Sequence, residues 1–374
     1  MRKLLTHARS RLLHHVDRST KLTLRVQRHR NRVFDRVMHA WTLLGDIEFF
    51  IVLLPALRWI AYPLGFTSFQ FAYRFTALLL TSVLVAGVIK DVFNAPRPPQ
   101  GVVWMLKVEI DKGFVSSHSM TTAALAFFSF ATLTPGLSGT GQLLALLAAV
   151  CWSALVAFSR LYLGAHSYPD IFAGYTLGVL FGVAWSSNSI ASWTLGWPPA
   201  IFSAIVALVH PRPPTVTATR ALLLACSMLG VALAFELDAR DWSDTLVVQA
   251  LHSLPHFSLP FVDACSPVGP ALVRVIVGGI AFRGVHVAGR NLFRFVTPVI
   301  PFGALDAVGR VVALPTFAYD DLAADRKRNL AHDIQHAQSR ALAAILIMFV
   351  VFWAIPTLLL DPLKAAHVAG DCRP

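Results

Sequence analysis

One short polar stretch, SRLYLGAHSYPD at residues 159–170, holds three chemically capable side chains between two apolar runs. His166 precedes Asp170 by four residues, and Pro169 favours a helix that begins at this point. Asp170 would then lie in the first helical turn, where it could accept a hydrogen bond from a ring N–H of His166. That bond would fix the histidine tautomer and leave the other ring nitrogen available for nucleophilic attack, with the cation Arg160 nearby.

A second polar break, KDVFNAPRPP at residues 90–99, carries two cations. Lys90 ends an apolar run, and Arg97 stands between two prolines. Proline fixes its own φ angle and restricts the residue before it, so the guanidinium is presented on a stiffened backbone. This pair is suited to binding an anion.

A third polar break, FVSSHSMTT, begins the apolar run that follows. Ser116, Ser117 and Ser119 are good N-cap residues, and His118 stands among them. The backbone N–H groups of a helix start form a ready site for an anion. We therefore expect hydroxyls, amides and one imidazole at the same point.

The three breaks are expected on one face of a membrane. Two predicted spans, near 119–134 and 142–158, separate the third break from the opening stretch, so the chain returns to the face that it left. Lys90, Arg97 and Arg160 would then meet. Three cations match a phosphate monoester, which carries a charge of about −1.5 to −2 at neutral pH.

The composition indicates a membrane protein, because 56% of the 374 residues are hydrophobic and only 14% are charged. Runs of roughly 17–22 apolar residues are each long enough to cross a bilayer as a helix. The prediction is an all-α, multi-pass transmembrane helical bundle with about nine spans. Candidate segments lie near 41–62, 72–90, 119–134, 142–158, 170–187, 191–209, 220–236, 260–281, 292–315 and 341–360, and the prolines in 292–315 predict a broken or re-entrant segment.

Composition also suggests three regions. Residues 1–40 form a basic N-terminal tail, residues 41–209 a transmembrane core, and residues 210–374 a C-terminal transmembrane region of unassigned role. A proline-rich linker at 210–220 separates the last two.

The N-terminal tail holds eleven Lys and Arg residues against Asp17 and Asp35. It could be a basic helix on anionic lipid headgroups, an organelle transit peptide, or a solvated tail that only sets membrane topology. Nucleic-acid binding is not expected, since no basic patch interleaves with aromatic residues elsewhere.

Taken in order, the three breaks resemble the pattern of the type 2 phosphatidic acid phosphatase (PAP2) superfamily, K-x6-RP, PSGH and SR-x5-H-x3-D. The first and third parts match at full spacing. The second departs, with Val115 for proline and Ser117 for glycine. The SSHS and SRLYLGAHS forms look like the sphingoid-base-1-phosphate phosphatase branch, and LGDIEFF at residues 44–50 is a weaker echo of it. The resemblance implies a six-helix lipid-phosphatase-like core with additional C-terminal spans.

The resemblance also implies roles for individual residues. His166 would attack phosphorus and form a phosphohistidine, Asp170 would orient it, and His118 would protonate the leaving alkoxide. The phosphate-binding set would be Lys90, Arg97, Ser116 and Arg160. Three cations can do what Mg²⁺ does elsewhere, so no metal or cofactor is expected.

Several alternatives stay open. The substrate could instead be phosphatidate, an isoprenyl (pyro)phosphate or glucose-6-phosphate, and a catalytically silent lipid-phosphate carrier is the alternative from another class. Oligomeric state is not predicted.

The motif HDIQH at 332–336 is expected to be a solvated helix rather than a zinc site, because no third ligand is evident.

Two carboxylates, Asp46 and Glu48, fall inside the first predicted span. Buried carboxylates in a membrane are expensive, so we expect a pair with Arg58 or Arg74, or a span that begins later.

The location follows from the resemblance, which implies the endoplasmic reticulum membrane with the site on the lumenal face. The distribution of Lys and Arg residues predicts the opposite face of the membrane. With two spans before Lys90, the basic tail and the site share one face, and the positive-inside rule then places both in the cytosol.

Overall fold

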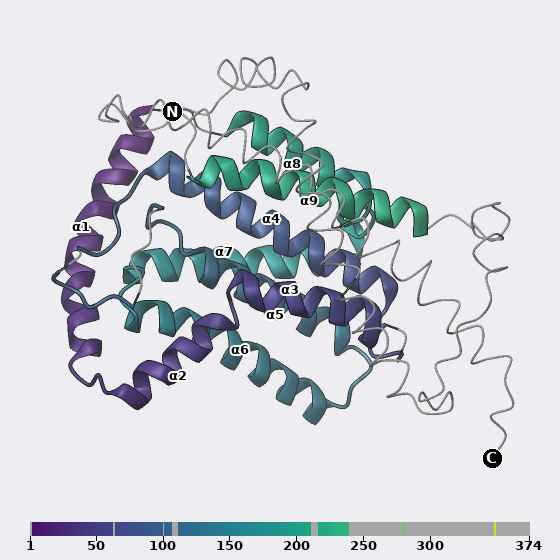
Figure 1. Ribbon diagram of the computed structural model, residues 1–374, viewed down its shortest axis with the longest axis horizontal. Coiled ribbons are helices and arrows are strands. Elements are labelled where there is room, and N and C mark those ends of the chain that lie inside the picture. The colour runs from purple at the N-terminus through teal and green to yellow at the C-terminus, as the bar shows by residue number, and fades with distance from the viewer. Residues whose placement is uncertain are drawn as a thin grey trace, which may run out of the picture.

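The computed structural model describes residues 2–62, 64–99, 101–106, 111–210 and 216–238, with the single positions Ile280 and Met348. Over these residues the chain is helical and contains no β-strand, which confirms the predicted all-α class for them. The helices are α1 (Arg2–Gln27), α2 (Arg32–Leu43), α3 (Ile47–Ala56), α4 (Phe69–Phe93), α5 (Ser117–Leu133), α6 (Gly139–Tyr162), α7 (Tyr168–Ser186), α8 (Trp197–Val209) and α9 (Val216–Asp238) (Figure 1).

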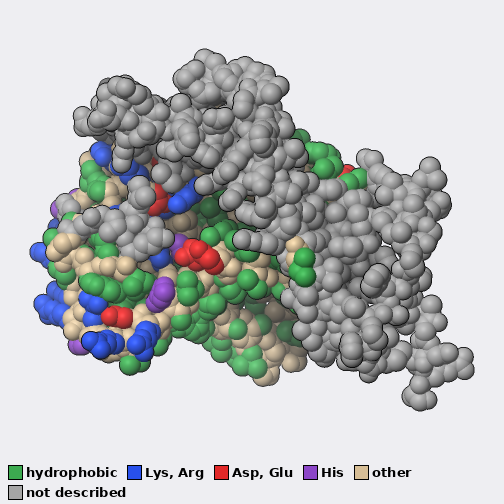
Figure 2. All heavy atoms as spheres, viewed as in Figure 1, with side chains coloured by type: hydrophobic (Ala, Val, Ile, Leu, Met, Phe, Trp, Pro, Cys, Tyr) green, Lys and Arg blue, Asp and Glu red, His purple; other side chains and the backbone are tan. Residues whose placement is uncertain are grey.

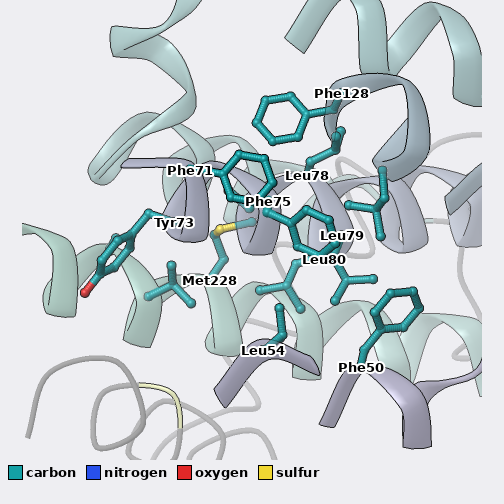
Figure 3. Packing of buried hydrophobic residues seen from close by; sticks show 14 of the residues in the cluster. Phe50, Leu54, Phe71, Tyr73, Phe75, Leu78, Leu79, Leu80, Phe128 and Met228 are labelled. Atoms are coloured by element: carbon teal, nitrogen blue, oxygen red, sulfur yellow. The ribbon is translucent and has the colours of Figure 1, made fainter. Parts of the chain in front are cut away.

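Helix α4 lies at the centre of the packing, because its side chains are apolar on every face. Its residues Phe71, Phe75 and Leu78 pack with Phe128 of α5 and Met228 of α9 (Figure 3). Helices α3, α5, α8 and α9 therefore surround α4 and shield it.

The ends of α4 are set by local chemistry. The Ser68 hydroxyl accepts a hydrogen bond from the Phe71 N–H at 3.1 Å and begins the helix. Asn94 ends it in the left-handed region, with φ of 46°. Lys90, one turn before this cap, is thereby held at the end of a buried helix.

Helices α5 and α7 pack closely along a stripe of glycines at Gly174, Gly178 and Gly182. A Cβ atom at Gly174 would lie 2.6 Å from the carbonyl oxygen of Ser116. A Cβ atom at Gly178 would overlap the carbonyl oxygen of Met120. Small residues four apart let two helical backbones approach in a membrane protein. The stripe fixes the start of α5 against the start of α7.

Within the described residues, three helices are long and apolar enough to cross a membrane, namely Phe69–Phe93, Gly139–Tyr162 and Arg220–Leu237. Residues 32–43 and 47–61 would count as one further span, although they bend by 51° at the break between them. The span predicted near 41–62 is divided between two helices, because Asp46 caps a new helix there, its carboxylate accepting from the Ile47 N–H at 3.1 Å.

The basic N-terminal segment is a helix docked on the bundle. Helix α1 runs across the ends of the other helices (Figure 1). The Gln27 side chain donates to the carbonyl oxygens of Trp104 and Tyr162, both at 2.8 Å, and Val16 is buried. The solvated-tail alternative was therefore wrong for residues 2–27. Lys and Arg side chains gather on the surface at this edge (Figure 2).

Other sequence expectations lie outside the described residues. These are the spans near 260–281, 292–315 and 341–360, the HDIQH motif, and most of the proline-rich linker.

Candidate active site

All seven site residues predicted from the sequence lie in the part of the chain that the structure describes, at the ends of α4, α5, α6 and α7. Lys90 is in the last turn of α4 and Arg160 in the last turn of α6. Ser116 and His118 begin α5, while Asp170 begins α7. The remaining two, Arg97 and His166, lie in the loops that follow α4 and α6.

Arg97 joins the first and third motifs. Nη1 of its guanidinium lies 3.2 Å from Nε2 of His166, and the same nitrogen donates to the carbonyl oxygen of Ala165. An N–H directed at Nε2 requires that nitrogen to carry its lone pair. The nitrogen that faces the cation is thus the one available to attack.

A carboxylate that the sequence reasoning did not include, Asp111, joins the two cations of the first motif. Its Oδ2 lies 2.6 Å from Nζ of Lys90, and its Oδ1 accepts from the Arg97 guanidinium. The side chains of Lys90 and Asp111 are 3% and 7% exposed, so both charges are removed from solvent. Buried charges of this kind need partners, which each supplies to the other.

Asp170 and His166 are close but not hydrogen-bonded. Nδ1 of His166 lies 3.7 Å from Oδ2 of Asp170, beyond the range of a hydrogen bond. That oxygen instead accepts from the Ser167 N–H at 2.8 Å and helps to begin α7. Neither His166 Nδ1 nor Asp170 Oδ1 has a hydrogen-bond partner among the described residues. The expected His–Asp bond therefore needs a small approach of two buried groups.

The start of α7 differs slightly from expectation. Tyr168 is its first residue, and Pro169 takes the second position. A left-handed Gly164, with φ of 68°, turns the chain between α6 and His166. Asp170 stays in the first turn as expected.

Ser116 is the N-cap of α5, as predicted. Its hydroxyl oxygen accepts from the Ser119 N–H at 3.4 Å and the Ser119 hydroxyl at 3.0 Å. Its backbone N–H donates to the carbonyl oxygen of Asp170 at 3.0 Å. The start of α5 is thereby fixed beside that of α7.

The break between α2 and α3 lies over His118, the histidine at the start of α5. Oδ1 of Asp46 lies 3.8 Å from Nε2 of His118. A Cβ atom at Gly45 would lie 2.7 Å from Cγ1 of Val156 and 3.1 Å from Cγ2 of Thr122, so the absence of a side chain lets the break approach α6 and α5. Thr42 at the end of α2 accepts a hydrogen bond from Arg160 at 2.9 Å.

The expected partners of Asp46 were wrong. Within the described chain, Arg74 donates to the carbonyl oxygen of Trp185, and Arg58 lies over the ring of Tyr62. Asp46 faces His118 instead. Apart from the weak resemblance of LGDIEFF, no sequence pattern predicted this contact, because a contact between residues 46 and 118 depends on tertiary packing.

The electrostatics of the loops follow from this arrangement. Burial lowers the pKa of His166 well below its usual 6.5, and the positive charges of Arg97 and Lys90 lower it further. The imidazole is therefore neutral at physiological pH. For Asp111, burial opposes ionisation, but Lys90 and Arg97 outweigh it and hold the pKa of that carboxyl below its usual range.

The geometry agrees with the family comparison. Residues 71–194 match the family model described as the PAP2 superfamily. The matched segment contains every residue of the three motifs, whereas α1, α2, α3, α8 and α9 lie outside it.

The chain is similar to several curated lipid phosphatases. A probable sphingosine-1-phosphate phosphatase from Dictyostelium discoideum is 27% identical, over 67% of this chain and 68% of its own. Lipid phosphate phosphatase delta from Arabidopsis thaliana is 26% identical, over 75% and 68%. A dihydrosphingosine 1-phosphate phosphatase from Schizosaccharomyces pombe is 26% identical, over 61% and 57%.

One solved structure also matches. The PAP2-type phosphatidylglycerolphosphate phosphatase from Bacillus subtilis is 23% identical, with a TM-score of 0.41, over 45% of this chain and 83% of that one.

Proposed function

We propose that this protein is a lipid phosphate monoesterase that hydrolyses sphingoid-base-1-phosphates to the free base and phosphate. The observation that carries the proposal is the contact of Arg97 with Nε2 of His166, which places a phosphate-binding cation on the nucleophilic nitrogen. The printed names of the relatives support this substrate class.

In the first step, Nε2 of His166 attacks phosphorus, and the bond between phosphorus and the lipid oxygen breaks. His118 donates its proton to the departing alkoxide, so the free base leaves as an alcohol. Asp170 moves into hydrogen-bond range of Nδ1 and stabilises the phosphohistidine. Catalytic hydrogen bonds are often long before substrate binds, which fits the 3.7 Å separation.

In the second step, water attacks the phosphohistidine. His118, now neutral, accepts the proton of that water, and the bond between phosphorus and Nε2 breaks. Phosphate leaves, and His166 returns to its neutral form. One histidine thus acts as acid and then as base.

The phosphoryl oxygens are held by Lys90, Arg97 and Arg160, together with Ser116 and the backbone N–H groups at the start of α5. Phosphoryl transfer depends mostly on positioning and charge stabilisation, which these groups supply. The proposal therefore includes no metal or cofactor.

A second substrate class has one observation in its favour. The Arabidopsis relative is named a lipid phosphate phosphatase without a sphingoid base in its name. Phosphatidate or an isoprenyl phosphate would use the same chemistry at His166. A catalytically silent carrier would bind these lipids without releasing phosphate.

We also propose the wider setting. The chain would have about nine spans, with residues 1–40 as a basic segment on anionic headgroups, residues 41–209 as a six-helix core, and residues 210–374 as a further membrane region. The resemblance implies the endoplasmic reticulum membrane and its lumenal face. The three candidate spans support membrane insertion itself.

Phosphate release by the detergent-purified protein tests the proposal. The substrates are dihydrosphingosine-1-phosphate, phosphatidate and an isoprenyl phosphate, each with EDTA present. We expect metal-independent release that favours the sphingoid substrate and is lost in His166→Ala. Release that favours another lipid would discard the substrate class, and tight binding without release would support the carrier.

A further inference from the structure

The last side chain of α1 bonds to two segments of the candidate site that are far apart in the sequence. Nε2 of Gln27 donates to the carbonyl oxygens of Trp104 and Tyr162, both at 2.8 Å. Its Oε1 accepts a hydrogen bond from the Trp104 N–H at 3.0 Å. A glutamate could not donate these bonds, and a lysine or arginine could not accept one, so the pattern requires a side-chain amide.

The same two residues are joined a second time through their side chains. The Arg30 guanidinium lies 3.4 Å from the centre of the Trp104 ring and pairs with Asp35 at 3.0 Å. Asp35 also accepts a hydrogen bond from the Tyr162 hydroxyl at 2.6 Å. Gln27, Arg30 and Asp35 thus form a clamp, the N-terminal clamp, on Trp104 and Tyr162.

The clamped residues lie next to groups of the candidate site. Trp104 belongs to the connection between α4 and α5, which also carries Arg97. Tyr162 ends α6, four residues before His166. A Cβ atom at Gly164, in the turn between them, would lie only 2.3 Å from the carbonyl oxygen of Trp104. The clamp therefore holds the connection of the first motif against the turn of the third.

We propose that Gln27 is a positioning residue for the proposed phosphatase reaction, because it holds the connection that carries Arg97 in place against His166. Nη1 of Arg97 lies 3.2 Å from Nε2 of His166, and a misplacement of about 1 Å can cost roughly a hundredfold in rate. Gln27 lies outside residues 71–194, so this role belongs to a part of the chain that the family model does not match. The inference rests on the proposed function, whereas the clamp itself can be tested without turnover.

The first test compares Gln27→Ala with a matched control, Gln142→Ala. Nε2 of Gln142 also donates to two carbonyl oxygens, those of Leu137 and Thr134 at 3.2 and 3.4 Å, but at the opposite end of α6. For dihydrosphingosine-1-phosphate we expect kcat to fall roughly tenfold or more in Gln27→Ala, since Arg97 is no longer held in place. The control should keep the wild-type kcat.

The pH profile separates positioning from stability. Burial lowers the pKa of His166, and the charge of Arg97 lowers it further. The charged and titratable groups that face His166 are Arg97, Lys90, Arg160, His118 and Asp170. If Gln27→Ala lets Arg97 move away, the pKa of His166 should rise, and kcat/KM should be lost at a higher pH on acidification than in the wild type. A variant that only unfolds more easily would keep the wild-type profile.

Hydrogen exchange tests the clamp without turnover. In Gln27→Ala the amides of residues 101–106 should exchange roughly fivefold faster or more, as for the loss of one hydrogen bond, and Gln142→Ala should leave them unchanged. Tyr162→Phe, which removes only the hydroxyl bonded to Asp35, is a milder second variant. It should change exchange and kcat in the same direction by a smaller factor.

Unchanged exchange in both clamp variants would overturn the inference. Faster exchange with the wild-type kcat and pH profile would overturn the catalytic role of Gln27 and leave the phosphatase intact. A wild-type protein that releases no phosphate would overturn the proposed function instead, and the exchange result would still decide whether Gln27 holds Trp104.

Discussion

At the residue scale, the proposed nucleophile His166 is surrounded by the cations that are proposed to bind the substrate. The charges of Arg97 and Lys90, together with burial, lower the pKa of His166 and so disfavour its protonation. Binding and nucleophilicity thus depend on one electrostatic arrangement. The lowered pKa also reduces the free-energy cost of burying His166, because a neutral imidazole is buried at lower cost than a charged one.

This arrangement predicts the pH dependence. Since the pKa of His166 is lowered well below 6.5, protonation should not inactivate it until the pH falls well below that value. We therefore expect protonation of His166 to cause no loss of kcat/KM as the pH falls through 6.5, and the measurement is a kcat/KM profile on both sides of that pH. The substrate's own second ionisation, near 6, is separated by repeating the profile with an aryl phosphate of lower pKa. A loss of kcat/KM below pH 6.5 that is the same with both substrates would contradict the prediction.

Asp46 offers a second test at this scale. Its carboxylate faces His118, and an anion there would favour the protonated ring that the proposed mechanism uses as acid. Asp46→Asn should lower kcat about tenfold, within the contribution of general acid catalysis, and shift the basic limb of the pH profile to lower pH. Asparagine still caps α3, so the helix itself should be retained.

The matched control is Glu48→Gln, which removes an exposed charge two residues away. Thermal unfolding of both variants separates stability from activity. A lower unfolding temperature with an unchanged pH profile in Asp46→Asn would show a purely structural role.

At the element scale, close helix packing sets the distance between the second and third motifs. Gly174 lies against Ser116, so the glycine stripe of α7 determines how near Asp170 comes to the start of α5. A bulky residue in the stripe would separate the two helices and with them the histidines.

Gly178→Leu should therefore lower both thermal stability and phosphate release, because its side chain would overlap the backbone of α5. Gly136→Ala, where the structure leaves open space, should change neither. A stable, inactive Gly178→Leu would support control of site geometry alone. Wild-type activity in that variant would contradict the role of the stripe.

Much of this could be predicted from the sequence. The motif residues are local, so their places at helix ends followed from capping residues and apolar runs. Ser116 as an N-cap and Asp170 in the first turn are examples. Asp111, Asp46 and the break at Gly45 could not be found in this way, because each depends on contacts between segments far apart in the chain.

At the scale of the whole molecule, the basic helix α1 lies at the same end of the bundle as the site. Arg9 donates to the carbonyl oxygen of Phe93 at 3.0 Å, the last residue of the helix that carries Lys90. The buried face of this helix therefore contacts the segments that carry the candidate site. Its contacts with Trp104 and Tyr162 make it part of the scaffold.

Membrane topology is the prediction that belongs to this scale. The positive-inside rule predicts a cytosolic site, because α1 carries its charges at the site's face, whereas the resemblance predicts a lumenal one. Glycosylation acceptors inserted at 101–106 and at 135–138 lie at opposite ends of the bundle. Modification at 101–106 would support the lumenal face and show that the charge of α1 does not set topology. Modification at 135–138 would support the cytosolic face.

The central claim is that His166 carries the phosphoryl group, and trapping that intermediate tests it most directly. Purified His118→Ala protein, in which the second step should be slow, is mixed with an aryl phosphate labelled in its phosphate, whose leaving group needs no proton from His118, and is quenched in base. Phosphohistidine survives base, so peptide mass spectrometry can locate it. We predict label on His166, and none in a variant that also lacks this histidine. Turnover by wild-type protein with no label on His166, or with label on another residue, would contradict the mechanism.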